Sequence, residues 1–429
     1  MAKILIKNGR IVDPASNLDE KKDLLIVDGK ISKIGTSLKV KGAKIVDAKG
    51  MLVLPGLIDM HTHLRDPGRP DKETIASGTR AAALGGFTSV CCMANTAPAI
   101  DTPAVVKYIL DKARVEGVVN VLPVAAVTRG LKGEALTEMG LLAASGAIAF
   151  SDDGQPIVHS DMMRRALEYA RQFKALVISH CEDQDLSAGG SMNEGALATK
   201  IGLPGVPALS EEIMVARDIM LAKEFGRLHL AHISSAKSVA LIRQAKKKKN
   251  PITCETCPHY FSLTEEAVAE YDPNAKVNPP LKTAKDVEAI IKGLKDGTID
   301  VIATDHAPHS VEEKNVEFNA AASGLVGLET ALALVLTKLV GPKKLSLKEA
   351  ISKMTIVPAE ILGIDKGTLK VGAEADVIIV DPAASLIVDP AKFASKGKNS
   401  PFAGMKVKGR VLYTIVGGKI IVSNGKIIS

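Results

Sequence analysis

Short apolar runs alternate with longer amphipathic stretches through the middle of the chain. Eight apolar runs lie at 57–60, 89–93, 119–127, 147–150, 176–179, 228–233, 252–256 and 300–303. Between them, apolar residues recur at three- and four-residue steps, the helical period, over 73–84, 102–115, 161–173, 210–225, 235–247 and 284–294. Such alternation predicts an α/β fold with a parallel sheet covered by helices. Eight units favour a closed (β/α)8 TIM barrel, and no GxGxxG motif follows the first run to suggest a dinucleotide-binding sheet.

The two ends of the chain carry a different pattern. Residues 1–54 contain short alternating strands with turn signals such as Asp28-Gly29, and residues 366–429 repeat this pattern around Gly417-Gly418. These dipeptides between alternating apolar residues are typical of β-hairpins. Because chain termini often lie close together, we expect both segments to form one small β-sandwich domain. The barrel is then assigned to residues 55–365.

Composition and charge narrow the class of protein. The chain has 429 residues, of which 46% are hydrophobic and 24% charged, as in ordinary globular proteins. It has no apolar run of about 18 residues that would span a membrane. The first residues lack the apolar stretch of a signal peptide, so a cytoplasmic location is expected. A net charge of +7 arises from 55 basic and 48 acidic residues dispersed along the chain, which indicates an ordinary solvated surface and not a nucleic-acid site. The mild positive charge would also suit a small anionic substrate.

The number and spacing of the five cysteines do not fit a disulfide framework or a structural metal site. Their number is odd, and a cytoplasmic chain rarely forms disulfides. Cys254 and Cys257 make one CxxC motif, but a structural zinc site needs a second pair. Cys181 follows His180 directly, and strand alternation points its thiol away from that imidazole. Buried thiols at strand ends are therefore the default expectation.

Histidines gather at the predicted carboxyl ends of the strands, where active sites of such barrels form. His61 and His63 are two residues apart in a strand and so face the same side. His180 and His232 each close a later strand, whereas His229 is expected to face the opposite side from His232. A single such histidine is more often a hydrogen-bonded core residue. Together they predict a metal site.

Carboxylates complete the predicted site. Asp305 follows the eighth strand, where it could bind a metal ion and move a proton. After the fourth strand, one of Asp152 and Asp153 can reach the centre while the other caps the following segment. Four neutral imidazoles and two carboxylates contribute a charge of −2, which suits two divalent cations. Imidazole and carboxylate ligands favour zinc, although manganese or cobalt would also bind.

Several motifs resemble the amidohydrolase superfamily and, more narrowly, the class I (bacterial type I) dihydroorotases. They are HTHLRDPG at 61–68, FSDDG at 150–154, SHCED at 179–183, VNPPL at 277–281 and ATDHAPH at 303–309. The HxH motif is shared by the whole superfamily, whereas the FSDDG and NPPL motifs are much more specific. The likeness extends over nearly the whole chain.

The resemblance implies a role for each candidate residue. One metal ion would be held by His61, His63, Asp153 and Asp305, and a second by Asp153, His180 and His232. These would be zinc ions (Zn²⁺), two per chain, with Asp153 as the bridge and Asp305 also as the catalytic proton carrier. The expected substrate contacts are Arg65, Asn95 and His309 for the α-carboxylate, Asn278 for the pyrimidine ring, and Gly324. The Gly324 loop departs from the family pattern, because Ala322 stands where proline is usual.

The implied activity is that of a dihydroorotase. This enzyme cyclises N-carbamoyl-L-aspartate reversibly to (S)-dihydroorotate in de novo pyrimidine (UMP) biosynthesis. One alternative is another cyclic-amide hydrolase, such as a hydantoinase, dihydropyrimidinase or allantoinase. In those relatives a carboxylated lysine after strand four bridges the metal ions, and residues 146–153 contain no lysine. The other alternative is a non-catalytic scaffold for aspartate transcarbamoylase, which would have lost metal ligands.

Three features are left open by the sequence. The resemblance suggests a homodimer, but no self-complementary surface can be identified from the residues. It also leaves open whether activity needs an aspartate transcarbamoylase partner. The segment 310–324 has few large apolar residues and could be a mobile lid or an ordinary surface loop.

Overall fold

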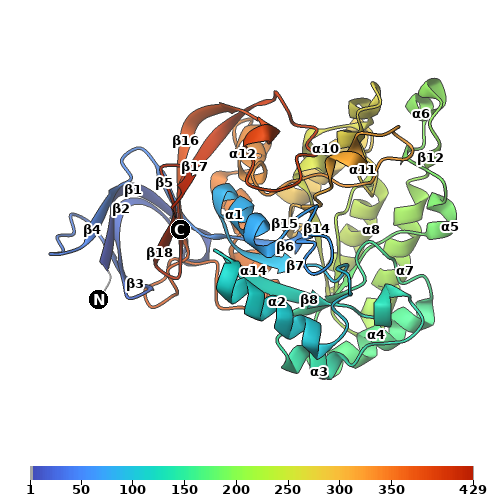
Figure 1. Ribbon diagram of the computed structural model, residues 1–429, viewed down its shortest axis with the longest axis horizontal. Helices are drawn as coiled ribbons and strands as arrows, with labels where there is room; N and C mark the ends of the chain where they lie inside the picture. Colours follow the sequence, from blue (N-terminus) through green and yellow to red (C-terminus); the bar gives the residue numbers. More distant parts are fainter. Residues whose placement is uncertain (1–2, 429) are drawn as a thin grey trace.

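A computed structural model describes residues 3–428, and its centre is a parallel eight-stranded barrel (Figure 1). Each strand overlaps one of the eight predicted apolar runs, and neighbours in the sheet follow chain order. The strands are β6 (Leu57–Thr62), β7 (Phe87–Cys92), β8 (Asn120–Ala125), β9 (Ala149–Ser151), β10 (Val177–Ser179), β13 (Leu228–Leu230), β14 (Ile252–Thr256) and β15 (Val301–Ile302).

The barrel closes between its first and last strands. Just after β6, the His63 N–H donates to the carbonyl of His306 at 2.8 Å, and Thr62 pairs with His306 in a parallel bridge. Deeper in the barrel, the Asp59 carboxylate accepts hydrogen bonds from the backbone N–H and the hydroxyl of Thr304. The prediction of a (β/α)8 barrel is therefore confirmed.

The six predicted helices are present, each within two residues of its predicted ends. They are α1 (Ile75–Gly85), α2 (Pro103–Glu116), α4 (Ser160–Gln172), α7 (Leu209–Phe225), α8 (Ala236–Lys247) and α10 (Ala284–Lys295). Threonine or serine side chains accept the first free N–H groups of α1, α2, α8 and α10, which fixes where these helices begin.

Other helices were not predicted. They include α3 (Met139–Ala144) and, after the last barrel strand, α12 (Ala331–Val335) with the π-helical turn η5 (Leu336–Val340), α13 (Leu347–Ser352) and α14 (Ile356–Leu362). Short elements lie in the loops at the carboxyl ends of the strands: η2 (Arg129–Leu131), α5 (Gln184–Ser187), β11 (Met192–Asn193), α6 (Ala196–Ile201), β12 (Gly205–Val206), α9 (Pro258–Ser262), η3 (Glu265–Val268), η4 (Pro273–Ala275) and α11 (Val311–Lys314).

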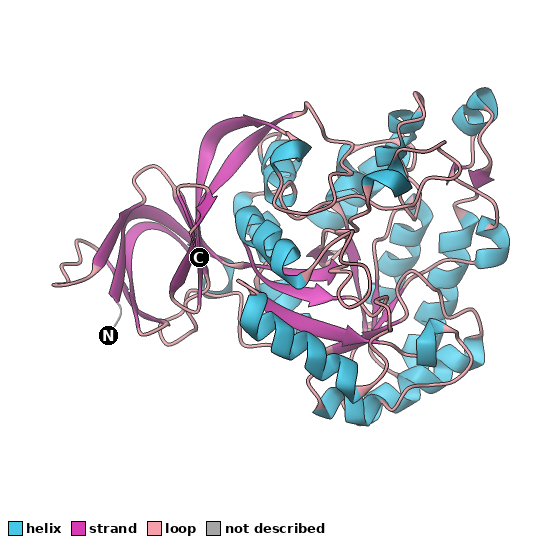
Figure 2. Ribbon diagram, in the orientation of Figure 1, coloured by secondary structure: helices cyan, strands magenta, loops and turns pink. Residues whose placement is uncertain are grey.

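Both ends of the chain contribute to one further sheet of nine strands, which is separate from the barrel in Figure 2. It contains β1 (Lys3–Asp13), β2 (Leu18–Val27), β3 (Lys30–Gly35), β4 (Lys44–Asp47), β5 (Leu52–Pro55), β16 (Val377–Ile387), β17 (Lys406–Val416), β18 (Lys419–Ser423) and β19 (Lys426–Ile427), with η1 (Pro14–Ser16) and η6 (Pro390–Lys392) in its loops. The two ends meet where β5 pairs antiparallel with β16. This sheet is consistent with the predicted terminal β-domain, whereas the boundaries drawn at 54/55 and 365/366 stay predictions.

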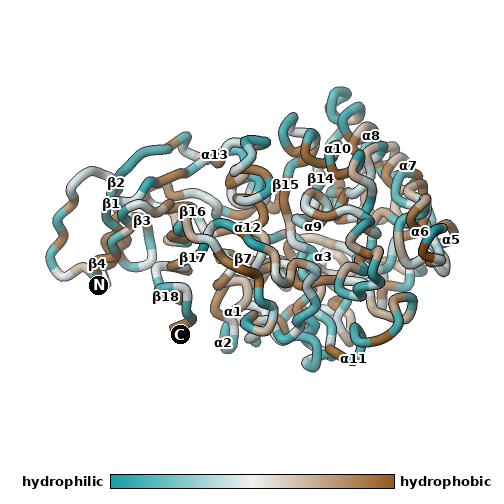
Figure 3. The backbone as a smooth tube through the Cα atoms, turned by 90° about the horizontal axis from the view of Figure 1, so that it is seen from above, coloured by the Kyte–Doolittle hydropathy of each residue, from teal (hydrophilic) through white to brown (hydrophobic). Residues whose placement is uncertain are grey.

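Apolar side chains fill separate layers of the molecule. Ile58, Met60 and Val124 belong to one buried cluster, and Phe87 and Phe150 belong to a larger one that includes residues of the helices. The hydropathy colouring of Figure 3 shows β7 as a hydrophobic strand. All five cysteines are buried and unpaired, as expected. Among residues 3–428, no helix is long and apolar enough to cross a membrane.

Candidate metal centre

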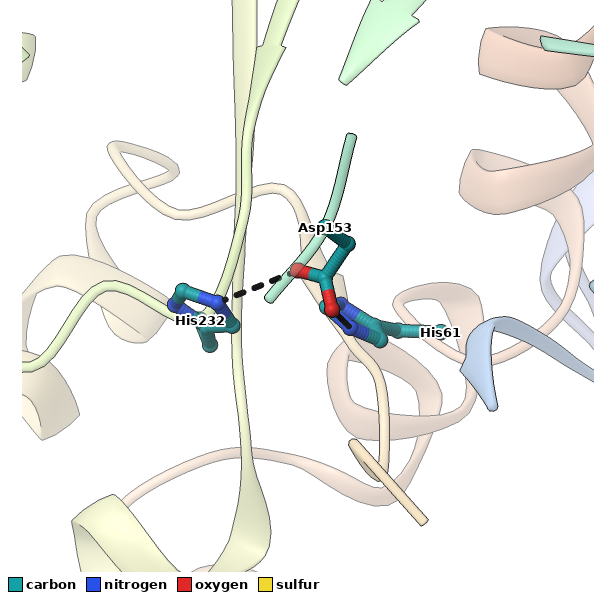
Figure 4. A group of neighbouring side chains, drawn as sticks. All are labelled: His61, Asp153 and His232. Atoms are coloured by element: carbon teal, nitrogen blue, oxygen red, sulfur yellow. Dashed lines mark ion pairs between the residues drawn. The ribbon is translucent and has the colours of Figure 1, made fainter. Parts of the chain in front are cut away.

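Asp153 lies at the centre of four imidazoles that come from the ends of three strands, β6, β10 and β13. Its Oδ2 atom is 3.2 Å from His61 Nε2 and 3.4 Å from His63 Nε2. Its Oδ1 atom is 3.5 Å from His180 Nδ1 and 3.4 Å from His232 Nε2. Figure 4 shows the carboxylate between His61 and His232. Each oxygen therefore faces its own pair of histidines.

Asp305 joins the first pair of histidines. Its Oδ1 atom lies 3.1 Å from His63 Nε2 and 3.5 Å from His61 Nε2. On the other side of Asp153, His180 Nδ1 and His232 Nε2 are 2.8 Å apart. The structure thus brings together all six residues that the sequence nominated as metal ligands.

The donors converge closely enough to hold divalent cations. His61, Asp153 and His232 form one buried group of converging ligand atoms, and His61, His63 and Asp305 form another. Within residues 3–428, His61 Nε2 and Asp153 Oδ1 are buried without a hydrogen-bond partner. A buried polar atom without a partner is costly, and a metal ion would satisfy both. Imidazole nitrogen and carboxylate oxygen are ligands that suit zinc and similar ions.

The electrostatics of the site also call for positive charge. Burial alone would lower the pKa of the His61 imidazole, but nearby carboxylates, led by Asp153 and Asp305, raise it well above its usual value. Burial opposes the shift at His180 too, yet Asp153 and Glu182 raise its pKa to about 10. These imidazoles would bind protons because the carboxylates around them carry an excess of negative charge. Divalent cations would neutralise the same excess.

Side chains behind the histidines fix which ring nitrogen points to the centre. Glu255, within β14, lies with Oε1 2.6 Å from His61 Nδ1. Glu182 Oε2 is 2.9 Å from His180 Nε2, and Asn95 Oδ1 is 2.8 Å from His63 Nδ1. Such partners set the tautomer and the orientation of a metal-binding imidazole.

Glu255 and Glu182 were missed by the sequence reasoning, although each had a signal. Glu255 interrupts an apolar strand, Ile252–Thr256, in which a charged residue needs a buried partner. Glu182 lies within the SHCED motif, two residues from His180. A buried charge beside predicted metal ligands is the pattern that would have found them.

The expectation for His229 is wrong. It is buried, with Nε2 3.2 Å from Glu255 Oε2, so it lies against the carboxylate that also holds His61. Alternation failed because β13 ends at Leu230, and His232 has a left-handed backbone with φ of +34°. The turn at His232 brings its ring back to the side that His229 faces.

Asp152 has a different role from the one expected. It accepts hydrogen bonds from the backbone N–H groups of Val127 and Thr128, at 2.8 and 3.0 Å, and from the Thr128 hydroxyl. It therefore fastens the loop after β8 instead of capping the segment that follows it. Its neighbour Asp153 is the aspartate that reaches the centre.

Three of the five predicted substrate contacts, Arg65, His309 and Gly324, lie together. Arg65 Nη2 is 3.5 Å from His309 Nε2, and Arg65 Nε donates to the carbonyl of Pro308. A Cβ added to Gly324 would lie 3.1 Å from His309 Nε2, so this glycine borders the same imidazole. Asn278 lies elsewhere on the rim, where its amide donates to Glu182 at 3.0 Å. Asn95, as described, contacts His63.

Backbone strain is concentrated at three of these residues. Arg65, His232 and Asp305 all have positive φ angles, of +57°, +34° and +49°. Residues other than glycine seldom adopt this region, and such strain clusters at functional sites.

The segment 310–324 is fastened beside the Arg65–His309 pair. Glu313 accepts from Lys72 at 2.8 Å and from Arg69 at 3.0 Å, and it lies 2.8 Å from His309 Nδ1. The buried Lys314 ammonium donates to the carbonyls of Pro273 and Ala322. In this structure the segment is therefore packed against the site by charged contacts, while its motion as a lid stays a prediction.

The chain is similar to known proteins over nearly its whole length. The Amidohydrolase family model matches residues 52–421. Proteins named dihydroorotase from Pelotomaculum thermopropionicum and Acetivibrio thermocellus are 56% and 55% identical, over 98% of this chain and 99% of each relative. Among solved structures, the L-hydantoinase (dihydropyrimidinase) from Arthrobacter aurescens matches with a TM-score of 0.91 and 27% identity. That match covers 100% of this chain and 98% of the other.

Proposed function

The chain belongs to the amidohydrolase family, and we propose that it acts within this family as a dihydroorotase. The observation that carries this proposal is Asp153, whose two oxygens face two separate pairs of histidines. No lysine takes this place in β9 or in the residues beside it. Relatives that are 52–56% identical over nearly their whole length carry the same name.

The family is metal-dependent, and we propose two zinc ions per chain. His61, His63, Asp153 and Asp305 would hold the first, and Asp153, His180 and His232 the second. When bound, such paired cations polarise a carbonyl group and lower the pKa of water. The buried donors that lack partners, His61 Nε2 and Asp153 Oδ1, support this assignment.

The side chains around this centre would orient and open a cyclic amide. The Arg65 guanidinium offers a planar donor pair to the substrate's α-carboxylate, with His309, Asn95 and Gly324 beside it. Asn278 would contact the ring from its position beside Glu182. These contacts would hold the ring amide carbonyl against the histidine cluster, in the orientation that the reaction needs.

Asp305 is the group that moves the proton. In ring opening, it accepts a proton from the attacking water and delivers it to the ring nitrogen as the C–N bond breaks. In cyclisation, it takes the proton from the ureido nitrogen of N-carbamoyl-L-aspartate. That nitrogen attacks the side-chain carboxylate as the C–N bond forms. One carboxylate oxygen then leaves as water, with the proton that Asp305 carries and a second proton from solvent.

The test is the ultraviolet absorbance of dihydroorotate on addition of the purified, zinc-loaded chain. We expect the absorbance to fall as the ring opens, and hydantoin and dihydrouracil to be poor substrates under the same conditions. Asp305→Asn should lower kcat by at least about 100-fold, because the proton carrier is lost. Faster turnover of hydantoin or dihydrouracil would instead favour the hydantoinase-like alternative, whose fold this chain shares.

The assembly state is part of the same proposal. We propose a homodimer with aspartate transcarbamoylase as a candidate partner. Sedimentation velocity tests the homodimer. Full turnover by the chain alone would show that activity does not need the transcarbamoylase, whereas a chain that binds zinc but turns over dihydroorotate only when the transcarbamoylase is present would show that it does.

A further inference from the structure

A segment from the terminal sheet reaches the carboxylate end of the proposed substrate site. It runs from Ala394 to Asn399, within the connection between β16 and β17, far in sequence from the barrel strands. Gly397 packs so closely against Pro308 that an added Cβ would lie 2.7 Å from the proline side chain. The segment therefore touches the turn that carries His309.

Asn399 makes the decisive contacts of this segment. Its Oδ1 atom accepts from the His309 N–H at 3.1 Å. Its Nδ2 atom donates to the carbonyls of Ala307 and Gly324, both at 3.0 Å. The Asn399 carbonyl accepts from the Val326 N–H at 2.9 Å. One buried residue thus joins the turn before His309 to the turn at Gly324.

The chemistry of the amide makes this role specific. An asparagine side chain has one oxygen acceptor and one nitrogen with two donor hydrogens, and all three functions are used here. An aspartate would turn an acceptor oxygen toward two carbonyl oxygens. Alanine would leave one buried N–H and two buried carbonyls without these partners, which is costly inside a protein.

The segment is itself fixed to the barrel at its base. Glu329 accepts from the backbone N–H groups of Ala394 and Ser395, at 2.8 and 3.2 Å. Glu73 accepts from the backbone N–H of Lys396 and also pairs with His306, at 3.3 Å. Asn399 therefore acts from a rigid support instead of a free loop.

We propose that Asn399 is a positioning residue that holds His309 and Gly324 in place for the substrate's carboxylate. The inference rests on the proposed function, because that function makes His309 a carboxylate contact and Gly324 a further substrate contact. It assigns the terminal sheet a part in substrate recognition. Asn399 itself need not touch the substrate, since it acts through the two backbone turns that it joins.

The first test measures ligand affinity and turnover in Asn399→Asp and Asn399→Ala. We expect the KM for dihydroorotate and the Kd for orotate, measured by calorimetry, to rise about 10- to 100-fold, as for loss of buried hydrogen bonds. The value of kcat should change less than about threefold, and the zinc content should stay unchanged. Asn250→Ala, in the loop before β14, is the matched control and should leave all of these unchanged. A fall in kcat or zinc content with unchanged KM would overturn the inference.

A double-mutant cycle tests whether Asn399 acts through His309. If it does, Asn399→Ala should weaken orotate binding much less in a His309→Ala background than in the native chain, because coupled sites are not additive. Fully additive effects would overturn the proposed route.

Hydrogen exchange without ligand separates this inference from the proposed function. Amides of His306, Ala307, His309 and residues 324–326 should exchange faster in Asn399→Ala, whatever the substrate is, while those of β10 should not change. Unchanged exchange at both turns would overturn the positioning role even in an active dihydroorotase. Faster exchange in a chain that neither binds orotate nor opens dihydroorotate would leave the positioning of the two turns standing and reject the proposed function.

Discussion

Glu255 decides how His61 presents its ring to the centre. The carboxylate is fully buried and lies against Nδ1 of His61, which leaves Nε2 for a metal ion. It also lies 3.2 Å from His229 Nε2, so its second oxygen is engaged as well. Charge and orientation at His61 both depend on this one side chain.

Replacing Glu255 by glutamine should weaken metal binding without removing a ligand. We expect the zinc dissociation constant, measured by competition with a chromogenic chelator, to rise about 10- to 100-fold, as is usual for such outer partners. Glu288→Gln, on the exposed face of α10, is the control and should bind zinc like the native chain. An unchanged dissociation constant in Glu255→Gln would show that the orientation of His61 is fixed by packing alone.

Glu329 should make stability depend on pH. Burial raises its pKa to about 7, and two backbone hydrogen bonds oppose the shift. Between its unfolded value and about 7, the folded state keeps a proton that the unfolded state loses, so stability falls as pH rises. Glu329→Gln should remove this slope. The free energy of unfolding of the variant, relative to that of the native chain, should therefore rise by about 2 kcal/mol as the pH goes from 5.5 to 8. Urea unfolding at pH 5.5 and pH 8 measures this difference. An equal change in the free energy of unfolding for both chains would contradict the raised pKa of Glu329.

The sequence predicted the proposed metal ligands at the strand ends better than the residues that hold the site in place. His61, His63, His180, His232 and Asp305 stand out because the alternating pattern places each at a strand's carboxyl end. Glu255 left a signal, a charge inside an apolar strand, but its partner His61 could not be named from it. Asn399 becomes recognisable only when distant segments meet, because it lies 90 residues from His309. No local pattern encodes a contact of that range.

At the scale of elements, hydrophobic periodicity predicted the helices that pack one apolar face against the barrel. The six helices with apolar residues on one side were found, whereas α12 was missed because all five of its residues are buried and it has no polar face. Short strands such as β15, with two residues, were found only because an apolar run marks them. The prediction for His229 was wrong for a similar reason: β13 ends at Leu230, so strand alternation does not extend from His229 to His232.

Asp286 caps two helices at once and should cost more to remove than an ordinary cap. Its Oδ2 accepts from Thr283 at the start of α10, and its Oδ1 accepts from the Ala236 N–H at the start of α8, at 2.9 Å. Asp286→Ala should lower the free energy of unfolding by about 2 kcal/mol, against about 1 kcal/mol for Thr283→Ala. Urea unfolding measures both. Equal losses would show that the α8 contact contributes little.

At the scale of the whole molecule, the terminal sheet and the barrel are parts of one site. The antiparallel pairing of β5 with β16 joins the two ends of the chain, and the connection after β16 then reaches His309. Hairpin signals could predict that both termini form strands. They could not predict that a loop of this sheet supports the mouth of the barrel.

The metal centre should also stabilise the entire fold. Its proposed ligands come from the ends of five strands, β6, β9, β10, β13 and β15, so a bound cation would join these strands to one another. A ligand that binds only the folded state at 100 times its Kd stabilises it by about 2.7 kcal/mol. Dipicolinate should therefore lower the melting temperature by about 5 °C, and added zinc should restore it. An Asp153→Ala variant, which loses the residue shared by both proposed sites, should respond much less to either treatment. An equal melting temperature for the zinc-depleted and zinc-loaded native chain would show that the barrel holds its charged centre together without a metal ion.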